Sequence, residues 1–136
     1  MRIETLLSTV IIPVAGVSLL SSPSHALDLS GAWATDGSVC QKMFVRKEKG
    51  ISFRPGSEVH GSGFIIDGNS IKGKAAKCVI KARREDGEII HLMAACATDI
   101  MLSNVQFSLR VVNENKVSRI FPGMEGMELA YDRCSL

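Results

Sequence analysis

The side chains best suited to catalysis in this 136-residue sequence are His60, Ser62 and a second histidine, His91. A serine hydroxyl becomes a nucleophile when a histidine within hydrogen-bond reach accepts its proton. Ser62 lies in the run His-Gly-Ser-Gly, whereas a nucleophile elbow requires Gly-x-Ser-x-Gly between a strand and a helix. The run is more typical of a glycine-rich loop or bulge. We therefore expect no catalytic site and no enzyme.

Four cysteines, Cys40, Cys78, Cys96 and Cys134, offer a second kind of chemistry. Four thiolates can hold zinc, but structural zinc sites use closely spaced pairs, and no Cys-x-x-Cys is present. The methionines and His91 are too dispersed for a copper site. An even number of cysteines in a small exported chain indicates two disulfides instead. We expect no metal and no cofactor.

A predicted hairpin selects the pairing of the cysteines. Residues 77–84 and 88–96 are strand-like and flank Glu85-Asp86-Gly87, a strong turn signal. A three-residue loop, 86–88, gives three facing apolar pairs on one side of the hairpin: Cys78 with Cys96, Ile80 with Ala94, and Ala82 with Leu92. The other side of the hairpin, which is more polar, then carries Lys81, Arg83, His91 and Met93. This register predicts a Cys78–Cys96 disulfide, which leaves Cys40–Cys134.

Short strand-like runs with turn signals between them fill the sequence after residue 26. We expect eight to ten strands, within 31–35, 43–46, 51–54, 63–66, 70–74, 77–84, 88–96, 104–112, 116–121 and 127–134. Asp36 is positioned to cap a short helical turn through Cys40, and residues 97–103 are the one place for a further short helix. The sequence predicts a single all-β domain over 27–136, an antiparallel meander closed into a barrel or folded as a sandwich.

The first 26 residues have the features of a secretory signal peptide. Residues 5–27 contain no charged side chain, residues 6–20 are rich in Leu, Val and Ile, and the small residues Ser24 and Ala26 precede a natural cleavage point. The apolar run is shorter than the roughly 20 residues of a membrane-spanning helix, and Pro13 interrupts it. We expect cleavage after Ala26, no stable membrane anchor thereafter, and a periplasmic or secreted product.

Positive charge is concentrated in the first half of the expected domain, although the net charge is only +2. Residues 42–84 contain eleven Lys or Arg and three acids, whereas residues 85–136 contain four and eight. The basic side chains that could share one strip are Lys72, Lys74, Lys77, Lys81, Arg83 and Arg84. Such a strip suits an acidic protein or an anionic envelope polymer, or it is a solvated edge that discourages strand association. Nucleic acid fits poorly, because no aromatic side chains are interleaved with the basic ones.

The run Leu29-Ser30-Gly31-Ala32-Trp33 resembles the Gly-x-Trp opening of calycin barrels, the lipocalin and avidin group. This resemblance implies that Trp33 closes the floor of a barrel and that Arg133, near the last strand, packs over it. Ser62-Gly63-Phe64 and Lys72-Gly73-Lys74-Ala75 are similar to the inhibitory region of exported bacterial lysozyme inhibitors. The layout as a whole resembles small exported proteins of unknown function in Gram-negative bacteria, a resemblance that implies no activity.

These features favour a non-catalytic exported binding protein that acts through its surface, for example as an inhibitor of an envelope or host enzyme. Its expected contacts lie in three regions. A first loop contains Gly61, Ser62, Gly63 and Phe64, a second loop contains Pro122 and Met124, and the basic strip contributes Lys81 and Arg83. The alternative is a calycin-like carrier of a small apolar ligand. A domain of about 110 residues leaves little room for a large cavity but enough for a small one.

Overall fold

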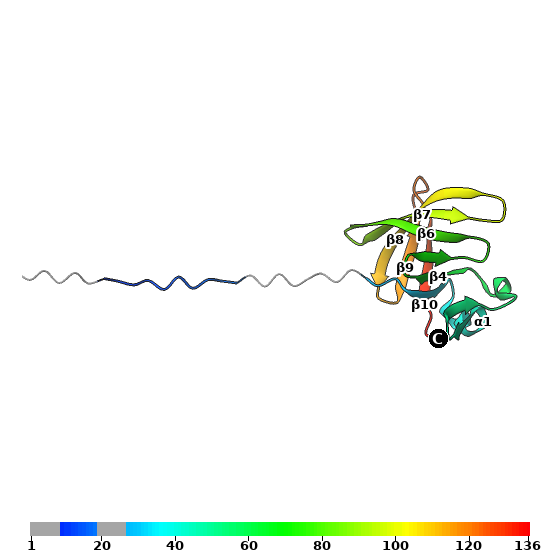
Figure 1. Cartoon of the computed structure of the whole chain (residues 1–136), viewed down its shortest axis with the longest axis horizontal. Helices are drawn as coiled ribbons and strands as arrows, with labels where there is room; N and C mark the ends of the chain where they lie inside the picture. The colour runs from blue at the N-terminus through cyan, green and yellow to red at the C-terminus, as the bar shows by residue number, and fades with distance from the viewer. Residues whose placement is uncertain (1–8, 19–26) are drawn as a thin grey trace, which may run out of the picture.

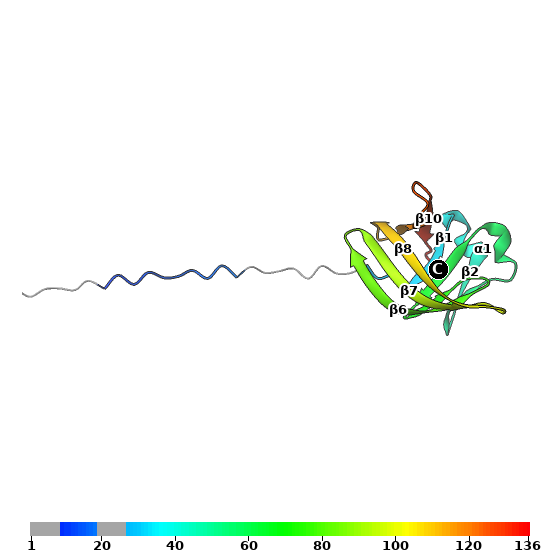
Figure 2. The ribbon, with the colours of Figure 1, turned by 90° about the horizontal axis from the view of Figure 1, so that it is seen from above.

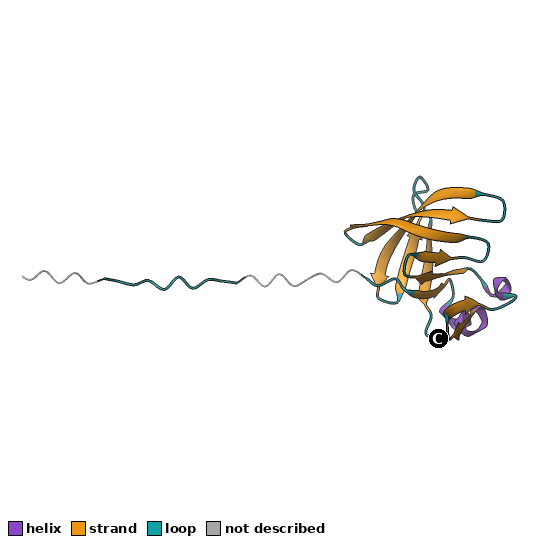
Figure 3. Cartoon of the chain, viewed as in Figure 1, coloured by secondary structure: helices purple, strands orange, loops and turns teal. Residues whose placement is uncertain are grey.

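Alternating apolar and polar side chains build ten strands in the residues that this computed structural model describes, 9–18 and 27–136 (Figures 1 and 3). Eight of these strands close into an antiparallel barrel, and the other two form a separate hairpin. The prediction of an all-β barrel is confirmed, and the sandwich alternative is excluded. The predicted leader, residues 1–26, falls mostly outside the described residues.

The barrel strands form a meander that the first strand closes. In chain order they are β1 (Gly31–Ala34), β4 (Gly63–Asp67), β5 (Ser70–Lys72), β6 (Lys77–Asp86), β7 (Ile89–Ala97), β8 (Leu102–Asn113), β9 (Lys116–Ile120) and β10 (Glu128–Arg133). From β4 to β10 each strand pairs with the next one along the chain, and β1 completes the ring between β10 and β4. The long strands β6, β7 and β8 curve together around one side (Figure 2).

The segment between β1 and β4 lies beside the barrel wall. It contains η1 (Gly37–Val39), α1 (Cys40–Met43), β2 (Phe44–Lys47), β3 (Gly50–Phe53) and η2 (Ser57–His60). The Asp36 carboxylate accepts a hydrogen bond from the Ser38 backbone N–H at 2.8 Å, so the predicted cap of this turn is confirmed. Met43 and Phe44 pack against Ile65 of β4 and the small side chains of β1, and both faces of β1 and β4 are therefore buried.

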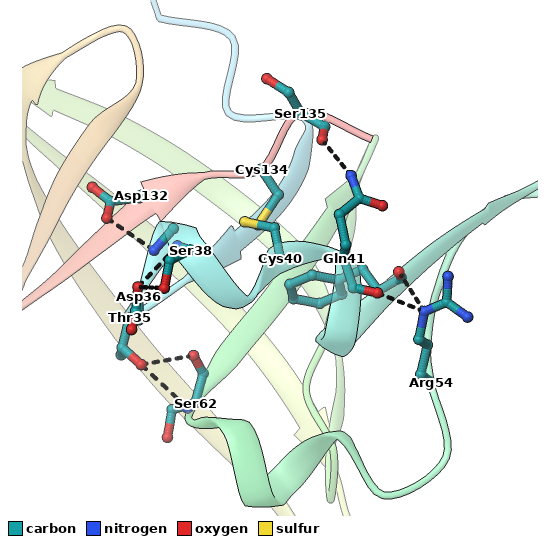
Figure 4. The surroundings of a disulfide bond; sticks show 12 residues. Thr35, Asp36, Ser38, Cys40, Gln41, Arg54, Ser62, Asp132, Cys134 and Ser135 are labelled. Carbon is teal, nitrogen blue, oxygen red and sulfur yellow. Dashed lines mark hydrogen bonds between the residues drawn. A yellow bond between two sulfur atoms is a disulfide. The ribbon is translucent and has the colours of Figure 1, made fainter.

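A disulfide between Cys40 and Cys134 joins this outer segment to the end of the barrel (Figure 4). Two hydrogen bonds run beside it: the Gly37 N–H donates to the Asp132 carboxylate at 3.2 Å, and the Gln41 side-chain amide donates to the Ser135 carbonyl at 3.1 Å. The predicted pairing is confirmed. One covalent bond and two hydrogen bonds thus hold the η1–α1 region to the C-terminal strand.

The β6–β7 hairpin contains the second predicted disulfide, Cys78–Cys96, which is also confirmed. Its loop, however, has two residues, Gly87 and Glu88, and the expected three-residue loop is wrong. Gly87 has a φ of 59°, the sign that a type II′ turn requires at its first central residue. The shorter loop changes the register at the turn by one residue, and a second irregularity compensates for the change before the cysteines are reached.

That irregularity is a β-bulge at Lys81. The extra residue in β6 makes Leu92 face Arg83 and not Ala82, so the pair expected between Ala82 and Leu92 is wrong. Because Leu92 is buried in the barrel core, Arg83 lies on the inner side of its strand. The expectation that Arg83 and Lys81 share the outer face is corrected accordingly.

The short helix considered for residues 97–103 is absent. β7 continues to Ala97 and β8 begins at Leu102, so four residues turn the chain. The Thr98 hydroxyl accepts hydrogen bonds from the backbone N–H groups of Ile100 and Met101, at 3.4 and 3.1 Å. A hydroxyl that bonds to the backbone two and three residues ahead stabilises a turn in place of a helix.

We expect the substitution Gly63→Ala to lower the free energy of unfolding by about 1–3 kcal/mol, because it overpacks a filled site. A Cβ at Gly63 would lie 2.5 Å from the Trp33 carbonyl oxygen and 2.9 Å from Cζ of Phe44. Urea unfolding followed by circular dichroism measures the change. Gly73→Ala is the matched control, because its Cβ would meet only the Ala76 carbonyl oxygen at an ordinary 3.6 Å. Equal effects of the two substitutions would contradict the prediction.

Candidate functional site

Arg133 and Trp33 close one end of the barrel, which we call the plugged end. The Arg133 guanidinium carbon lies 4.3 Å from the centre of the Trp33 ring system. The guanidinium donates hydrogen bonds of 2.6 to 3.0 Å to three backbone carbonyls, those of Ser30, Asp28 and Glu114. The Trp33 indole N–H donates to the Leu29 carbonyl at 2.9 Å. Each nitrogen of the guanidinium and the indole nitrogen thus donates to a backbone carbonyl.

Above this plug the barrel encloses a cavity of about 200 Å³ that opens to solvent at the other end. Its walls are mainly apolar and come from β4, β5, β7 and β8: Phe64, Ile66, Ile71, Leu92, Phe107 and Leu109. Gly73 and Ala76, in the loop between β5 and β6, form part of its rim. We call this the open end. Its volume is somewhat larger than the volume of an apolar protein cavity that binds benzene, which is about 150 Å³.

Arg119 of β9 is the cationic side chain of the cavity wall. Its strand alternates, so Arg119 points to the same side as Val117, which is fully buried in the core. The guanidinium carbon lies 4.7 Å from the centre of the Phe107 ring and 4.9 Å from that of Phe121. Two aromatic rings therefore hold the cation in place at the open end, and both contacts are cation–π interactions.

Tyr131 of β10 contributes the second polar group of the cavity wall. Burial raises the pKa of its hydroxyl above the ordinary value of 10.0, and the positive charge of the neighbouring Arg119 reduces that rise. Tyr131 is thus a neutral hydroxyl at neutral pH. Its ring also packs edge-on against Phe64, with the ring centres 4.9 Å apart.

No carboxylate among the described residues forms an ion pair with Arg119. The four ion pairs found there join Lys74 to Glu58, Arg83 to Glu85, Arg110 to Glu128, and Lys116 to Asp132. Carboxylates normally partner a cation that is partly removed from water. A guanidinium held between two rings at the mouth of an apolar cavity is therefore suited to bind an anionic group that comes from outside the protein.

The residues expected in the first contact loop separate into two groups. Gly61 and Ser62 are exposed, and the Ser62 backbone forms hydrogen bonds with Thr35 (Figure 4). Gly63 packs against the backbone of β1, and Phe64 points into the barrel, where it stacks on Trp33 with the ring centres 6.3 Å apart. Only the first two residues therefore belong to an outer surface.

The other expected contact residues lie at separate places. Pro122 and Met124 are exposed in the loop between β9 and β10. Lys81 is exposed at the β-bulge, whereas Arg83 turns toward the plugged end and donates a 2.8 Å hydrogen bond to the Leu27 carbonyl. The structure does not bring the two loops and the basic side chains together into one patch.

Among the described residues, two histidines were candidates for a nucleophile–base pair, His60 and His91. His60 ends η2, while Ser62 is engaged with Thr35 through its backbone. His91 Nδ1 lies 2.8 Å from the Ser108 hydroxyl oxygen and 3.2 Å from the Gln106 amide nitrogen. Ser108 is only 3% exposed, so its hydroxyl is buried beneath the barrel surface.

Arg119 and Tyr131 were not among the site residues expected from the sequence. One signal was present: in the run Lys116-Val117-Ser118-Arg119, alternation puts the arginine on the same face as a buried valine. A charged side chain on the apolar face of a strand is uncommon unless it has a partner or a function. The second signal, the enclosing rings of Phe107 and Phe121, depends on strand neighbours and on the loop that follows β9.

The fold and the cavity define a small closed β-barrel with a ligand-sized apolar interior. No family model matches the chain, and neither a curated protein nor a solved structure shows significant similarity to it. Over residues 9–18 and 27–136 there is no helix with the length and apolar character needed to cross a bilayer. The same residues contain no cluster of three or more His, Cys, Asp or Glu that could bind a metal ion.

Proposed function

We propose that this protein binds, inside its barrel and without catalysis, a small apolar molecule that carries one acidic group. The observation that supports this proposal is the lone guanidinium of Arg119 at the mouth of an apolar cavity. The hydrocarbon part of the ligand would fill the cavity between Phe64, Leu92 and Leu109. Its acidic group would accept hydrogen bonds from Arg119 and from the Tyr131 hydroxyl at the open end.

The volume of the cavity limits the ligand to a small molecule. Drug-sized ligand pockets occupy about 300–1,000 Å³, and this cavity is smaller. A medium-chain fatty acid or a single aromatic ring with a carboxylate matches the available volume, whereas a phospholipid does not. The role expected first from the sequence, binding of a partner through the surface, has weaker support because its candidate residues do not converge.

The two disulfides are consistent with an oxidising, exported compartment. We propose that the protein acts in the periplasm or after secretion, where its leader would direct it. There it would bind an acidic metabolite that enters or leaves through the cell envelope.

Calorimetric titration with octanoate and with 1-octanol tests the proposed function. Both molecules have the same hydrocarbon chain, but only octanoate carries a negative charge. Hydrogen bonds to charged groups contribute about 1.5–3 kcal/mol, so octanoate should bind at least about tenfold more tightly than 1-octanol. Equal affinities would refute the acidic ligand class, and failure of both molecules to bind would refute ligand carriage by this cavity.

A further inference from the structure

The end of the turn between β7 and β8 and the first residue of β8 present three consecutive apolar side chains to solvent. Ile100 is 92% exposed, Met101 is 61% exposed and Leu102 is 84% exposed. Single exposed apolar residues are common on protein surfaces, but contiguous ones at a protruding tip indicate an interaction site. We call residues 100–102 the apolar tip.

The conformation of the turn keeps the apolar tip exposed. The Thr98 backbone N–H donates to the Met101 carbonyl at 2.9 Å, and the Thr98 hydroxyl accepts from two backbone N–H groups of the turn. These bonds satisfy the turn locally and hold the three side chains away from the barrel. The tip is therefore an apolar projection at the end of two long strands.

Lysines lie on one side of the base of the apolar tip. The loop between β5 and β6 lies alongside, and Lys74 and Lys77 line a groove whose other wall is Ala97, Thr98 and Asp99. Lys72 faces Lys77 across the β5–β6 pair, so both extend from the same outer face. Lys74 forms an ion pair with Glu58, which leaves Lys72 and Lys77 as the cations of this rim.

The plugged end has a different character. Its turns are polar or acidic and comprise Gly68-Asn69, Gly87-Glu88 and Glu114-Asn115. Apolar side chains flanked by lysines therefore occur at the open end, beside the mouth of the cavity, because Gly73 and Ala76 border both the cavity and the lysine-lined groove.

We propose that the apolar tip docks on a lipid bilayer that contains anionic headgroups, with Lys72 and Lys77 contacting the headgroups. Peripheral binding to a bilayer requires apolar side chains that enter the interface and basic side chains that attract anionic lipid, and this rim provides both. A protein partner would need about 800 Å² from each side for a stable interface, more than three side chains on one narrow loop can offer. This docking role is separate from the proposed ligand binding and does not depend on it.

The orientation of the docked protein gives the sharpest test. Two full-length variants place a tryptophan at opposite ends of the barrel: Ile100→Trp in the apolar tip and Val112→Trp beside the plugged end. Val112 is 55% exposed, so both substitutions add an exposed ring, while the native Trp33 stays buried in each. Vesicles of equal parts phosphatidylglycerol and phosphatidylcholine with brominated acyl chains quench a tryptophan that enters the bilayer.

When the brominated vesicles are added, we expect the fluorescence of the introduced tryptophan to fall about twofold in Ile100→Trp and to stay unchanged in Val112→Trp. Quenching of Val112→Trp alone would show contact through the plugged end or through the segment that precedes it, and would overturn the proposal. Quenching of neither would overturn it as well. A soluble protein that co-purifies with the tip and is lost on Leu102→Ser, in the absence of quenching, would identify a protein as the occupant.

The lysines are tested in the Ile100→Trp background. The double substitution Lys72→Glu and Lys77→Glu should weaken binding to the anionic vesicles about tenfold or more, because each lysine near an anionic surface contributes substantially to attraction. The matched control is Lys47→Glu with Lys49→Glu, which changes the net charge equally in the β2–β3 hairpin. An equal loss of vesicle binding in the two double variants would show that only the net charge of the protein matters. That result would overturn the role assigned to Lys72 and Lys77.

The vesicle experiment and the octanoate titration test the two proposals separately, so one proposal can be refuted while the other stands. Octanoate binding without quenching would leave a carrier that does not dock, and quenching without octanoate binding would leave a docking protein whose cavity has another role.

Discussion

Replacing Arg119 by methionine should weaken octanoate binding about ten- to hundredfold and leave the affinity for 1-octanol nearly unchanged. The substitution removes the charge that would meet the carboxylate, and such charge-assisted hydrogen bonds are worth about 1.5–3 kcal/mol. Methionine is unbranched and makes favourable contacts with aromatic rings, so it can occupy the space between Phe107 and Phe121. Calorimetric titration of both ligands against the variant measures the change.

Arg110→Met is the control for this experiment. In the β8–β9 pair Arg110 faces Ser118, the residue before Arg119. The Arg110 side chain therefore lies on the outer face of the barrel, where it forms an exposed ion pair with Glu128 at 3.1 Å. Its loss should change octanoate binding by less than about twofold, because exposed ion pairs contribute little. Unchanged octanoate affinity in Arg119→Met, or an equal loss in both variants, would show that the guanidinium in the cavity does not recognise the acidic group.

Loss of the Cys40–Cys134 disulfide should cost more stability than loss of Cys78–Cys96. The first closes a loop of 94 residues and the second a loop of 18. In the chain-entropy model these loops correspond to about 4.7 and about 3.2 kcal/mol of unfolding free energy. A small domain has only about 5–15 kcal/mol in total, so the first loss is severe. Paired Cys→Ser variants, unfolded in urea, measure both values.

Each disulfide variant carries two serines, so the comparison is matched in composition. If the Cys78–Cys96 variant were the less stable one, the local fit of the β6–β7 hairpin would matter more than the entropy of the unfolded chain. The attachment of α1 to the barrel end gives a second readout. In the Cys40→Ser, Cys134→Ser variant, amide exchange should accelerate in α1 and β2 more than in the middle of β7.

The positions of the strands were predictable because their determinants are local. Turn residues such as Asp67-Gly68-Asn69 and Asn113-Glu114-Asn115 interrupt alternating runs, and each expected strand is found with shifts of only a few residues at its ends. The disulfide pairing was also predictable, because one hairpin brings Cys78 opposite Cys96 and elimination leaves the other pair. The bulge at Lys81 was not, since no residue type there requires it.

The all-β class, the meander order and the two disulfides follow from local patterns in the amino-acid sequence. Which end of the barrel is plugged, where the cavity lies and what surrounds Arg119 depend on how distant strands meet in the fold. The physical reason is distance along the chain: alternation and turns depend on neighbouring residues, whereas the cavity wall gathers Phe64, Phe107, Arg119 and Tyr131 from four strands. Their meeting depends on the closure of the ring between β1, β4 and β10, which no local pattern specifies.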